Sequence, residues 1–405
     1  MVTWVVLNDS SQRHNTKNFM RIPDYSGGSI VNLVSSIRQG CGGESTLYPE
    51  LREFTSERIA AAQNVVLLVL DGLGYDYLTT QGAGSRLQQQ LHCGLDSVAP
   101  PTTAASITTF LTGVAPQQHG LTGWFTWLRE VGAVVTVLPF AMRGNRSELN
   151  SHGITPQQLF NHTPLFDQLN VAGYSLMPEQ LGESVFSQAL LGKGELVLYR
   201  GMDDYFAKIS DLVQRDNQAK YLYAYWPQFD SLAHQFGLQS KQLAKQFAQL
   251  DRGFSRLQQR LSGSNTLLLV TADHGFINTT TESRLLINDY PDILACLQIP
   301  LCGEPRLPYC YVRSSQRERF VELVTQQLGH ALVIHQGETL IAEGLFGLGE
   351  AHPELNSRVG EFVLEMKDNY ILTQRLLGEA ESHMIGQHGG LSEAEIRVPL
   401  VVAHC

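Results

Sequence analysis

The chain has 405 residues, of which 43% are hydrophobic and 17% are charged, and its formal net charge is −10. This composition excludes a disordered chain, because it can bury a sizeable core. The acidic balance argues against electrostatic binding of nucleic acid or of an anionic membrane, since both need clustered Lys and Arg. Apolar runs such as residues 65–70 are far shorter than the roughly 20 residues that span a bilayer, so we expect no membrane segment.

The first residues and the cysteines point to a compartment. Residues 1–7 are followed by polar residues and lack the basic region and the long apolar region of a secretory signal. The six cysteines include no Cys-x-x-Cys pair and are too sparse for a disulfide framework. We therefore expect a cytoplasmic protein with free thiols.

Four β-branched or leucine-rich runs have the pattern of buried parallel strands. They are residues 65–70, 221–226, 266–271 and 398–403. Amphipathic segments lie between them, such as residues 241–261 with Leu and Phe at spacings of three and four. The alternation predicts an α/β fold with a mostly parallel central sheet and helices on both faces.

Two segments interrupt this alternation. The chain has no internal repeats, and we expect residues 1–405 to form one domain. Residues 276–376 predict an inserted α+β cap subdomain, because they contain strand-like and helical pieces of their own, at 308–312, 331–334, 361–365 and 316–328. Residues 129–207 form a possible second insertion, with apolar runs at 133–140 and 196–199.

Acidic residues follow three of the four runs. Asp71 comes directly after the first, Asp230 follows the second and Asp273 the third. Ligands of open α/β sheets gather outside the carboxyl ends of the strands, so these carboxylates are expected to meet. Asp230 and His234 are four residues apart on one helical face, and His274 follows Asp273. A solvated helix face or turn remains the alternative for each pair taken alone.

A third histidine, His388, lies in Gly-Gln-His-Gly-Gly, a loop that leads into the last run. Its glycines allow a close approach to a metal or ligand, although a plain loop histidine is the commoner explanation. Three Asp and three His without Cys form a ligand set that suits zinc, with manganese possible. Six ligands are enough for two metals with open positions.

Residues 99–113 predict a helix with a hydroxyl at its N-terminus. Paired prolines suit the entry, Thr102 or Thr103 can cap the helix, and Gly113 suits its end. Free N–H groups at a helix N-terminus bind phosphate, and a metal on the hydroxyl would make it a nucleophile. An ordinary threonine cap is the alternative.

The order of these motifs resembles the alkaline phosphatase superfamily, and within it most closely the type I phosphodiesterase and nucleotide pyrophosphatase family. The resemblance runs from about residue 20 to the C-terminus and is carried by Asp71-Gly, Pro-Thr-Thr103 with Thr112-Gly113 and His119-Gly120, Asp230-x-x-x-His234, Asp273-His274-Gly275 and His388-Gly-Gly. It implies an alkaline phosphatase-like three-layer sandwich with an inserted α+β cap.

The resemblance also implies a mechanism and a ligand set. Thr103, chosen over Thr102 for its distance to Thr112-Gly113, would attack phosphorus in a small-molecule phosphodiester or pyrophosphate, and water would hydrolyse the phosphothreonine intermediate. Two zinc ions would be held, one by Asp230, His234 and His388, the other by Asp71, Asp273, His274 and Thr103.

Two positions depart from the nucleotide-cleaving members of the family. Ala104 replaces the aromatic residue that stacks a nucleobase, and Leu121-Thr-Gly-Trp124 replaces the stretch with an asparagine that donates to a phosphoryl oxygen. The backbone N–H of Ala104 or the indole of Trp124 would then assist as substrate-binding groups, with packing as the alternative role of Trp124. No feature of the sequence indicates an oligomeric state.

Other functions remain open at this point. A phosphomonoesterase or phosphonate hydrolase of the same superfamily would share the metals and the nucleophile. A sulfatase would need Cys or Ser in place of Thr103, followed by a Pro and Arg motif, and the superfamily's phosphomutases use serine. A metal-stabilised binding protein without catalysis is the alternative from another class, although it would not need a poised hydroxyl.

Overall fold

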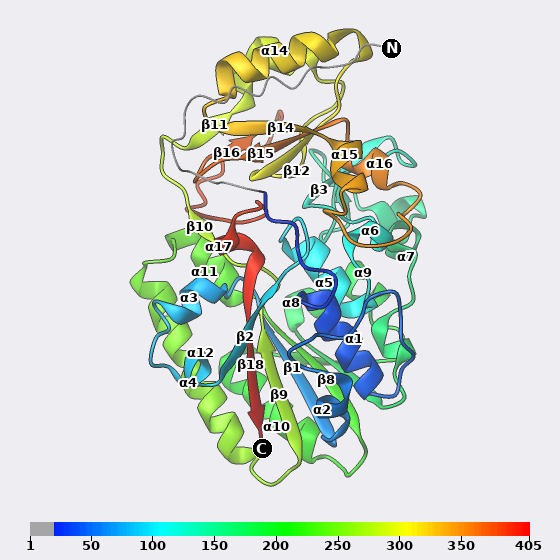
Figure 1. Ribbon diagram of the computed structural model, residues 1–405, viewed down its shortest axis with the longest axis vertical. Coiled ribbons are helices and arrows are strands. Elements are labelled where there is room, and N and C mark those ends of the chain that lie inside the picture. Colours follow the sequence, from blue (N-terminus) through cyan, green and yellow to red (C-terminus); the bar gives the residue numbers. More distant parts are fainter. Residues whose placement is uncertain (1–19) are drawn as a thin grey trace.

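The computed structural model describes residues 20–405. Residues 1–7, on which the expectation of no secretory signal rests, lie outside this range. Two seven-stranded sheets form the lower and upper lobes of the molecule in Figure 1. There are also two separate two-stranded sheets, β10 (Ile277–Asn278) with β17 (Gly386–Gln387) and β11 (Arg284–Leu286) with β16 (Ile371–Thr373). Over residues 20–405, no helix combines the length and apolar character that a membrane crossing requires.

The lower lobe contains the mostly parallel sheet that the sequence predicts. Five adjacent strands are parallel to one another, and one further strand runs against its two neighbours. At the middle of the seven-stranded sheet lie β9 (Thr266–Thr271), β1 (Asn64–Leu70) and β8 (Lys220–Trp226), and every residue of these strands is buried, because helices cover both faces. In spatial order the strands are β2 (Leu91–Asp96), β18 (Arg397–His404), β9 (Thr266–Thr271), β1 (Asn64–Leu70), β8 (Lys220–Trp226), β6 (Ala172–Pro178) and β7 (Glu195–Tyr199).

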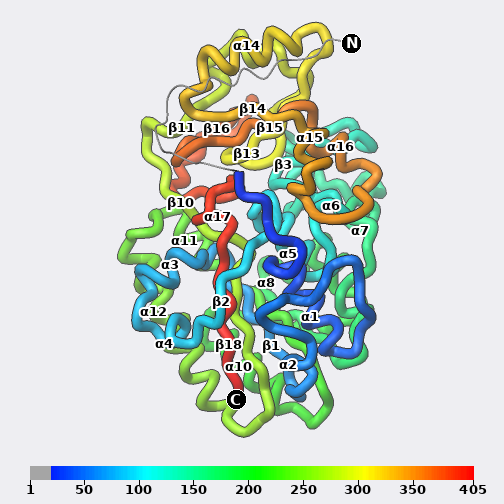
Figure 2. Tube along the Cα trace, in the orientation of Figure 1, coloured from blue at the N-terminus to red at the C-terminus, as the bar shows by residue number. Residues whose placement is uncertain are grey.

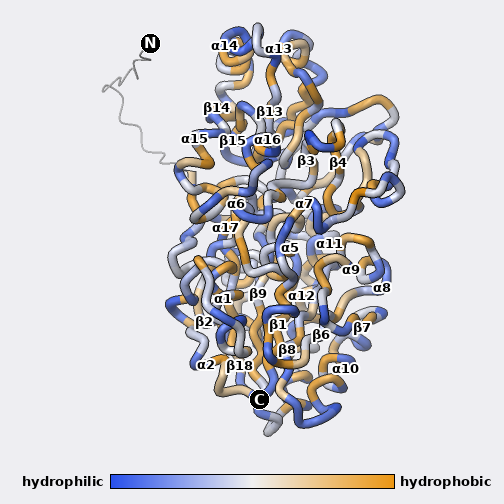
Figure 3. Tube along the Cα trace, turned by 90° about the vertical axis from the view of Figure 1, so that its right-hand side faces the viewer, coloured by the Kyte–Doolittle hydropathy of each residue, from blue (hydrophilic) through white to orange (hydrophobic). Residues whose placement is uncertain are grey.

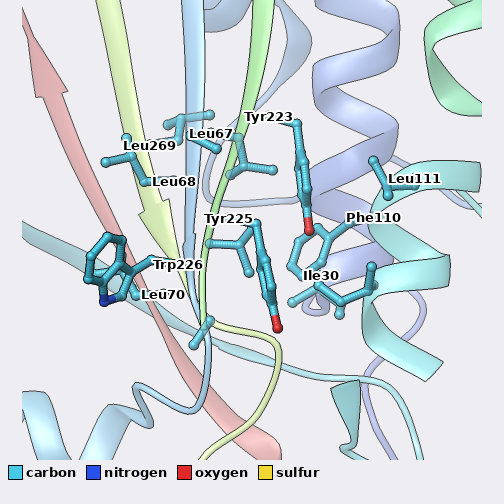
Figure 4. Packing of buried hydrophobic residues seen from close by; sticks show 14 of the residues in the cluster. Ile30, Leu67, Leu68, Leu70, Phe110, Leu111, Tyr223, Tyr225, Trp226 and Leu269 are labelled. Carbon is cyan, nitrogen blue, oxygen red and sulfur yellow. The ribbon is translucent and has the colours of Figure 1, made fainter. Parts of the chain in front are cut away.

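Residues on opposite faces of β8 pack against different helix layers (Figure 4). The ring of Tyr223 lies 6.4 Å from that of Phe110 in α5, whereas the ring of Trp226 lies 5.2 Å from that of Tyr205 in α10. The predicted sheet flanked by helices is therefore confirmed. The layer with α5 (Thr103–Thr112) also holds α1 (Ile30–Gly40) and α2 (Ser56–Ala60), and the layer with α10 (Gly201–Gln214) holds α11 (Gln228–Phe236) and α12 (Lys241–Arg260). In Figure 3, α1 and α2 lie on one side of the central strands and α10 lies on the other.

Shorter helices connect these elements. They are α3 (Tyr75–Thr79), α4 (Arg86–Gln89), α6 (Pro116–His119), α7 (Pro156–Phe160), α8 (Glu179–Gly182) and α9 (Val185–Ala189). The upper lobe adds α13 (Pro291–Cys296), α14 (Arg317–Leu328), α15 (Gly337–Ala342) and α16 (Leu355–Val359), and α17 (Glu393–Ile396) precedes the last strand.

Two distant segments build the antiparallel sheet of the upper lobe (Figure 2). Four of its strands come from the expected cap at residues 276–376, and three come from residues 125–142. In spatial order they are β14 (Leu332–Gln336), β15 (Phe362–Met366), β13 (Leu307–Cys310), β12 (Cys302–Glu304), β3 (Phe125–Leu128), β4 (Ala133–Thr136) and β5 (Ala141–Met142).

The segment 129–207, expected as a second insertion, is divided between the two sheets. Its first strands, β4 and β5, lie in the upper sheet, whereas β6 and β7 extend the central sheet beyond β8. Strand β6 reads Ala-Gly-Tyr-Ser-Leu-Met-Pro and lacks the β-branched run by which the other central strands are recognised.

Strand β18 runs antiparallel to β9, and the expectation of a fourth parallel strand is wrong on this point. A parallel return needs a crossover of a dozen or more residues, and the chain between β17 and β18 is shorter than that. Because β18 is reversed, its beginning lies at the edge where β1, β8 and β9 end.

A buried ion pair joins the upper lobe to this edge. Arg306, in the turn between β12 and β13, lies 2.9 Å from Glu395 of α17, and both side chains are almost fully buried. Glu395 also accepts a hydrogen bond from the backbone N–H of Gly390 at 2.8 Å, and Arg306 donates to the carbonyl oxygen of Tyr370 at 2.6 Å. Both partners are thus fixed by further bonds.

Glu395→Gln should lower the free energy of unfolding by about 3–5 kcal/mol, because it leaves the guanidinium of Arg306 buried without its counter-charge. Chemical denaturation measures this loss. The matched control is Glu195→Gln at the exposed pair with Arg215, which should cost about 1 kcal/mol or less. Equal losses in the two variants would contradict the role given to the buried pair.

Candidate active site

Three carboxylates converge where the parallel strands end. Asp71 follows β1, Asp273 lies two residues beyond β9, and Asp230 lies in the first turn of α11 after β8. Strand β1 pairs with both β8 and β9, so the three chain ends are neighbours. Gly72 makes the turn after β1 with a φ of 76°, and its N–H donates to Oδ1 of Asp273 at 3.0 Å.

The histidines surround these carboxylates as the sequence predicts. Nε2 of His274 lies 3.3 Å from Oδ1 of Asp71 and 3.5 Å from Oδ2 of Asp273. Around Oδ1 of Asp230, Nε2 of His234 lies at 3.3 Å, that of His388 at 3.9 Å and that of His274 at 4.0 Å. All six predicted acidic and imidazole side chains are therefore brought together.

Two groups within this cluster have the spacing of metal ligands. One is Asp71, Asp273 and His274, as the resemblance implies, and the other is Asp230, His274 and His388, with ligand atoms in each group within 4.8 Å of one another. His274 thus belongs to both groups. His234 stays beside Asp230 through the four-residue spacing on α11.

Each histidine ring is oriented by a backbone carbonyl on its far side. Nδ1 of His234 lies 2.9 Å from the oxygen of Gly386, that of His274 lies 3.0 Å from the oxygen of Gly275, and that of His388 lies 3.2 Å from the oxygen of Pro101. A carbonyl oxygen only accepts, so Nδ1 carries a proton in each ring. The other nitrogen, Nε2, faces the carboxylates, as in metal-binding histidines.

One oxygen of each carboxylate has no hydrogen-bond partner in residues 20–405 although it is buried: Oδ1 of Asp71, Oδ1 of Asp230 and Oδ2 of Asp273. These are the oxygens that face Nε2 of His274 or His234. The second oxygen is satisfied in two cases, by the Tyr225 hydroxyl on Asp71 and by backbone N–H groups on Asp273. Buried lone pairs facing one another require a positive charge between them.

The pKa values of the cluster also indicate that a positive charge is needed there. Burial, together with the nearby Asp230, raises the pKa of Asp71 well above its ordinary value, and burial with Asp71 does the same to the pKa of Asp273. Burial alone would lower the pKa of His234, but the Asp230 carboxylate raises it to about 9. Burial and the neighbouring His274 lower the pKa of His388. Divalent cations fit this donor set.

The predicted nucleophile lies at the edge of the cluster. Thr103 is the first residue of α5, and its Oγ1 lies 3.3 Å from Nε2 of His274. The neighbouring Thr102 is buried, and its hydroxyl donates instead to Oε1 of Glu304 at 2.7 Å. The geometry therefore favours Thr103, half-buried and next to the cluster, over Thr102.

The two candidate substrate-binding positions differ in exposure. The Ala104 side chain is fully buried within α5, so only the backbone of this residue could contact a ligand. Trp124 has 36% of its surface exposed, and its backbone N–H donates to Oε1 of Glu304 at 2.6 Å.

Sequence reasoning missed two residues that hold the site. Glu304 ends the three-residue strand β12 in the upper lobe, where no motif marks it. Tyr225 is part of the apolar run of β8, and only its position one residue before the strand's end could have placed its hydroxyl on Asp71.

Comparisons with known proteins agree with this architecture. The protein is similar to murine ectonucleotide pyrophosphatase/phosphodiesterase 5 in complex with AMP, with 16% identity over 83% of this chain and 87% of that chain and a TM-score of 0.62. The human protein of that name gives 16% identity, 84% and 87% coverage and the same score. Phosphonoacetate hydrolase from Sinorhizobium meliloti 1021, in complex with phosphonoacetate, gives 16% identity, 84% and 90% coverage and a TM-score of 0.59.

These similarities show a shared fold. No curated protein matches the sequence. The model of one enzyme family, however, matches residues 65–391, which include all six clustered side chains and Thr103. The chain belongs to the type I phosphodiesterase / nucleotide pyrophosphatase family, a family of phosphoric ester hydrolases.

Proposed function

We propose that this protein hydrolyses phosphodiester or pyrophosphate bonds in small molecules, with two bound metal ions and Thr103 as the nucleophile. The observation that carries the proposal is the position of the Thr103 hydroxyl. It stands at a helix N-terminus, 3.3 Å from Nε2 of His274, at the edge of a cluster of buried carboxylates and imidazoles. A hydroxyl in this place can attack phosphorus while the helix binds the phosphoryl oxygens.

Two zinc ions, or manganese, would be held by the cluster. Asp71, Asp273 and His274 would hold one together with the oxygen of Thr103. Asp230, His234 and His388 would hold the other, with His274 within reach of both. When bound, such cations polarise phosphoryl oxygens and lower the pKa of a hydroxyl at the site.

The residues of the chain then divide the reaction between them. Oγ1 of Thr103 loses its proton and forms the bond to phosphorus as the bond to the leaving oxygen breaks, which gives a phosphothreonine and a leaving group that takes up a proton. Water then attacks the phosphorus, the bond between phosphorus and Oγ1 breaks, and a proton of the water returns to Oγ1, so the free Thr103 hydroxyl and the phosphate product are released. The free N–H groups in the first turn of α5 stabilise the phosphoryl oxygens, since they carry the positive end of the helix dipole.

The residue at position 104 supports a second candidate, a phosphonate hydrolase. The similar structures include one protein in complex with AMP and one in complex with phosphonoacetate. The small, buried Ala104 offers no ring for stacking a nucleobase, whereas the exposed ring of Trp124 could contact a leaving group. A phosphomonoesterase shares the same machinery, and a non-catalytic binding protein would not need Thr103.

We further propose that residues 276–376 act as a cap over this site and that the protein is cytoplasmic. Glu304, which contacts the start of the nucleophile helix, supports the first proposal. The second is supported by the cysteines, all six of which are free thiols in the structure.

Thr103→Ala should reduce the turnover of bis(p-nitrophenyl) phosphate by the zinc-loaded enzyme by about 10³-fold or more, because the nucleophile is lost. Thr103→Ser keeps a hydroxyl and should retain much of the rate, and Thr80→Ala, at an exposed position, should leave it unchanged. The same assay with p-nitrophenyl phosphate separates a diesterase from a monoesterase. If Thr103→Ala stays within tenfold of wild type, Thr103 is not the nucleophile.

Chelation should abolish turnover and lower the Tm, because the buried oxygens of the cluster lose their counter-charge. Adding ZnCl2 to the chelated protein should restore turnover and raise the Tm, with a stabilisation of about 2.7 kcal/mol per site at a hundredfold excess over Kd. Differential scanning fluorimetry measures the shift. Asp273→Asn should reduce it, and the exposed Asp292→Asn should not. A wild-type Tm that does not respond to zinc or manganese would contradict the metal site.

A further inference from the structure

Glu304 of the upper lobe reaches into the site and contacts three of its parts. Its Oε1 accepts hydrogen bonds from the Thr102 hydroxyl at 2.7 Å and from the backbone N–H of Trp124 at 2.6 Å. Its side chain also packs on Gly389, where an added Cβ would lie 2.6 Å from Cγ of Glu304. The carboxyl group thus connects the start of the nucleophile helix, the Trp124 turn and the loop that carries His388.

These contacts change what Thr102 does at the start of α5. Thr102 occupies the N-cap position with extended backbone, where a threonine oxygen normally accepts from an N–H in the first helical turn. Here the side chain makes no such cap bond, because its hydroxyl is turned to Glu304. The N–H groups at the start of α5 therefore receive no cap from Thr102 and remain open to a ligand.

The environment of Glu304 argues that it does more than hold the lobes together. Among the described residues no Lys or Arg forms an ion pair with it, in contrast to the Arg306–Glu395 pair nearby. Burial raises the pKa of Glu304 to about 7. A buried carboxyl without a basic partner costs stability, which a purely structural contact does not require.

We propose that Glu304 is a positioning residue, which keeps the N-terminus of α5 open for the phosphoryl group by accepting the Thr102 hydroxyl. The proposal rests on the proposed function and assigns to the upper lobe a part in it. It also identifies the donors that compensate for the missing asparagine. Because Thr102 does not cap α5, the N–H groups of Thr103 and Ala104 are available to the phosphoryl oxygens, whereas the backbone N–H of Trp124 is occupied by Glu304.

The test compares two variants that both remove the charge. Glu304→Gln keeps an oxygen acceptor for Thr102, whereas Glu304→Leu keeps a similar volume without any acceptor. In Glu304→Leu the Thr102 hydroxyl is free to cap α5 and competes with the ligand. We expect the Kd of inorganic phosphate for the zinc-loaded protein, measured by calorimetry, to rise about five- to tenfold in Glu304→Leu and less than twofold in Glu304→Gln, the size of a typical N-cap contribution.

A double variant shows whether the effect passes through Thr102. Adding Thr102→Val to Glu304→Leu removes the competing hydroxyl and should restore most of the phosphate affinity, which a general loss of packing would not do. The KM for bis(p-nitrophenyl) phosphate should follow the same order. If Glu304→Leu does not fold, as judged by its thermal transition, Glu304→Ala takes its place in both comparisons.

The proposal is overturned if Glu304→Gln binds phosphate as weakly as Glu304→Leu, if Glu304→Leu binds like wild type, or if Thr102→Val brings no recovery. Phosphate binding does not require turnover, so the outcome is separate from the proposed function. If the phosphate Kd values of wild type and variants follow the expected order but the wild type cleaves no ester, hydrolysis is refuted and the role of Glu304 in phosphate binding stands.

Discussion

The structure depends on one electrostatic constraint, the burial of like charges at the end of a parallel sheet. Oxygens of Asp71, Asp230 and Asp273 lack hydrogen-bond partners within residues 20–405 and face imidazole nitrogens whose rings are fixed from behind. Such an arrangement is repulsive unless cations occupy the space between the atoms. The strands, the turn at Gly72 and the backbone carbonyls behind the rings hold these atoms in place, so the arrangement that favours a cation is set by the fold itself.

Glu395, another buried carboxylate near this edge, has a different environment. Glu395 receives the guanidinium of Arg306 at 2.9 Å and two further hydrogen bonds, and its charge is balanced within the protein. Asp71 and Asp273 receive no arginine or lysine in the described chain. The missing counter-charge at Asp71 and Asp273 supports the proposal that this cluster holds cations, and this support does not depend on similarity to other proteins.

The sequence could predict the central strands and the cluster because each acid follows a run of buried residues that is unmistakable in the chain. It could not predict the reversed direction of β18, because that depends on the short connection after His388 rather than on the strand's own residues. The local sequence pattern also could not predict that residues 129–207 are divided between two sheets, since β6 is recognisable only by its pairing with β8. Glu304 is a tertiary contact from a three-residue strand, and no periodicity marks such a residue.

The reversed last strand has a consequence for how the molecule is made. Strand β18 lies inside the sheet, between β9 and β2, so until residues 397–404 leave the ribosome β9 presents an open edge to the cell. The three aspartates emerge before the loop with His388 does, because they precede it in the chain. The nascent chain therefore passes through a stage in which β9 is unpaired on one side and the cluster still lacks the imidazole of His388, and such an open strand edge is prone to aggregation.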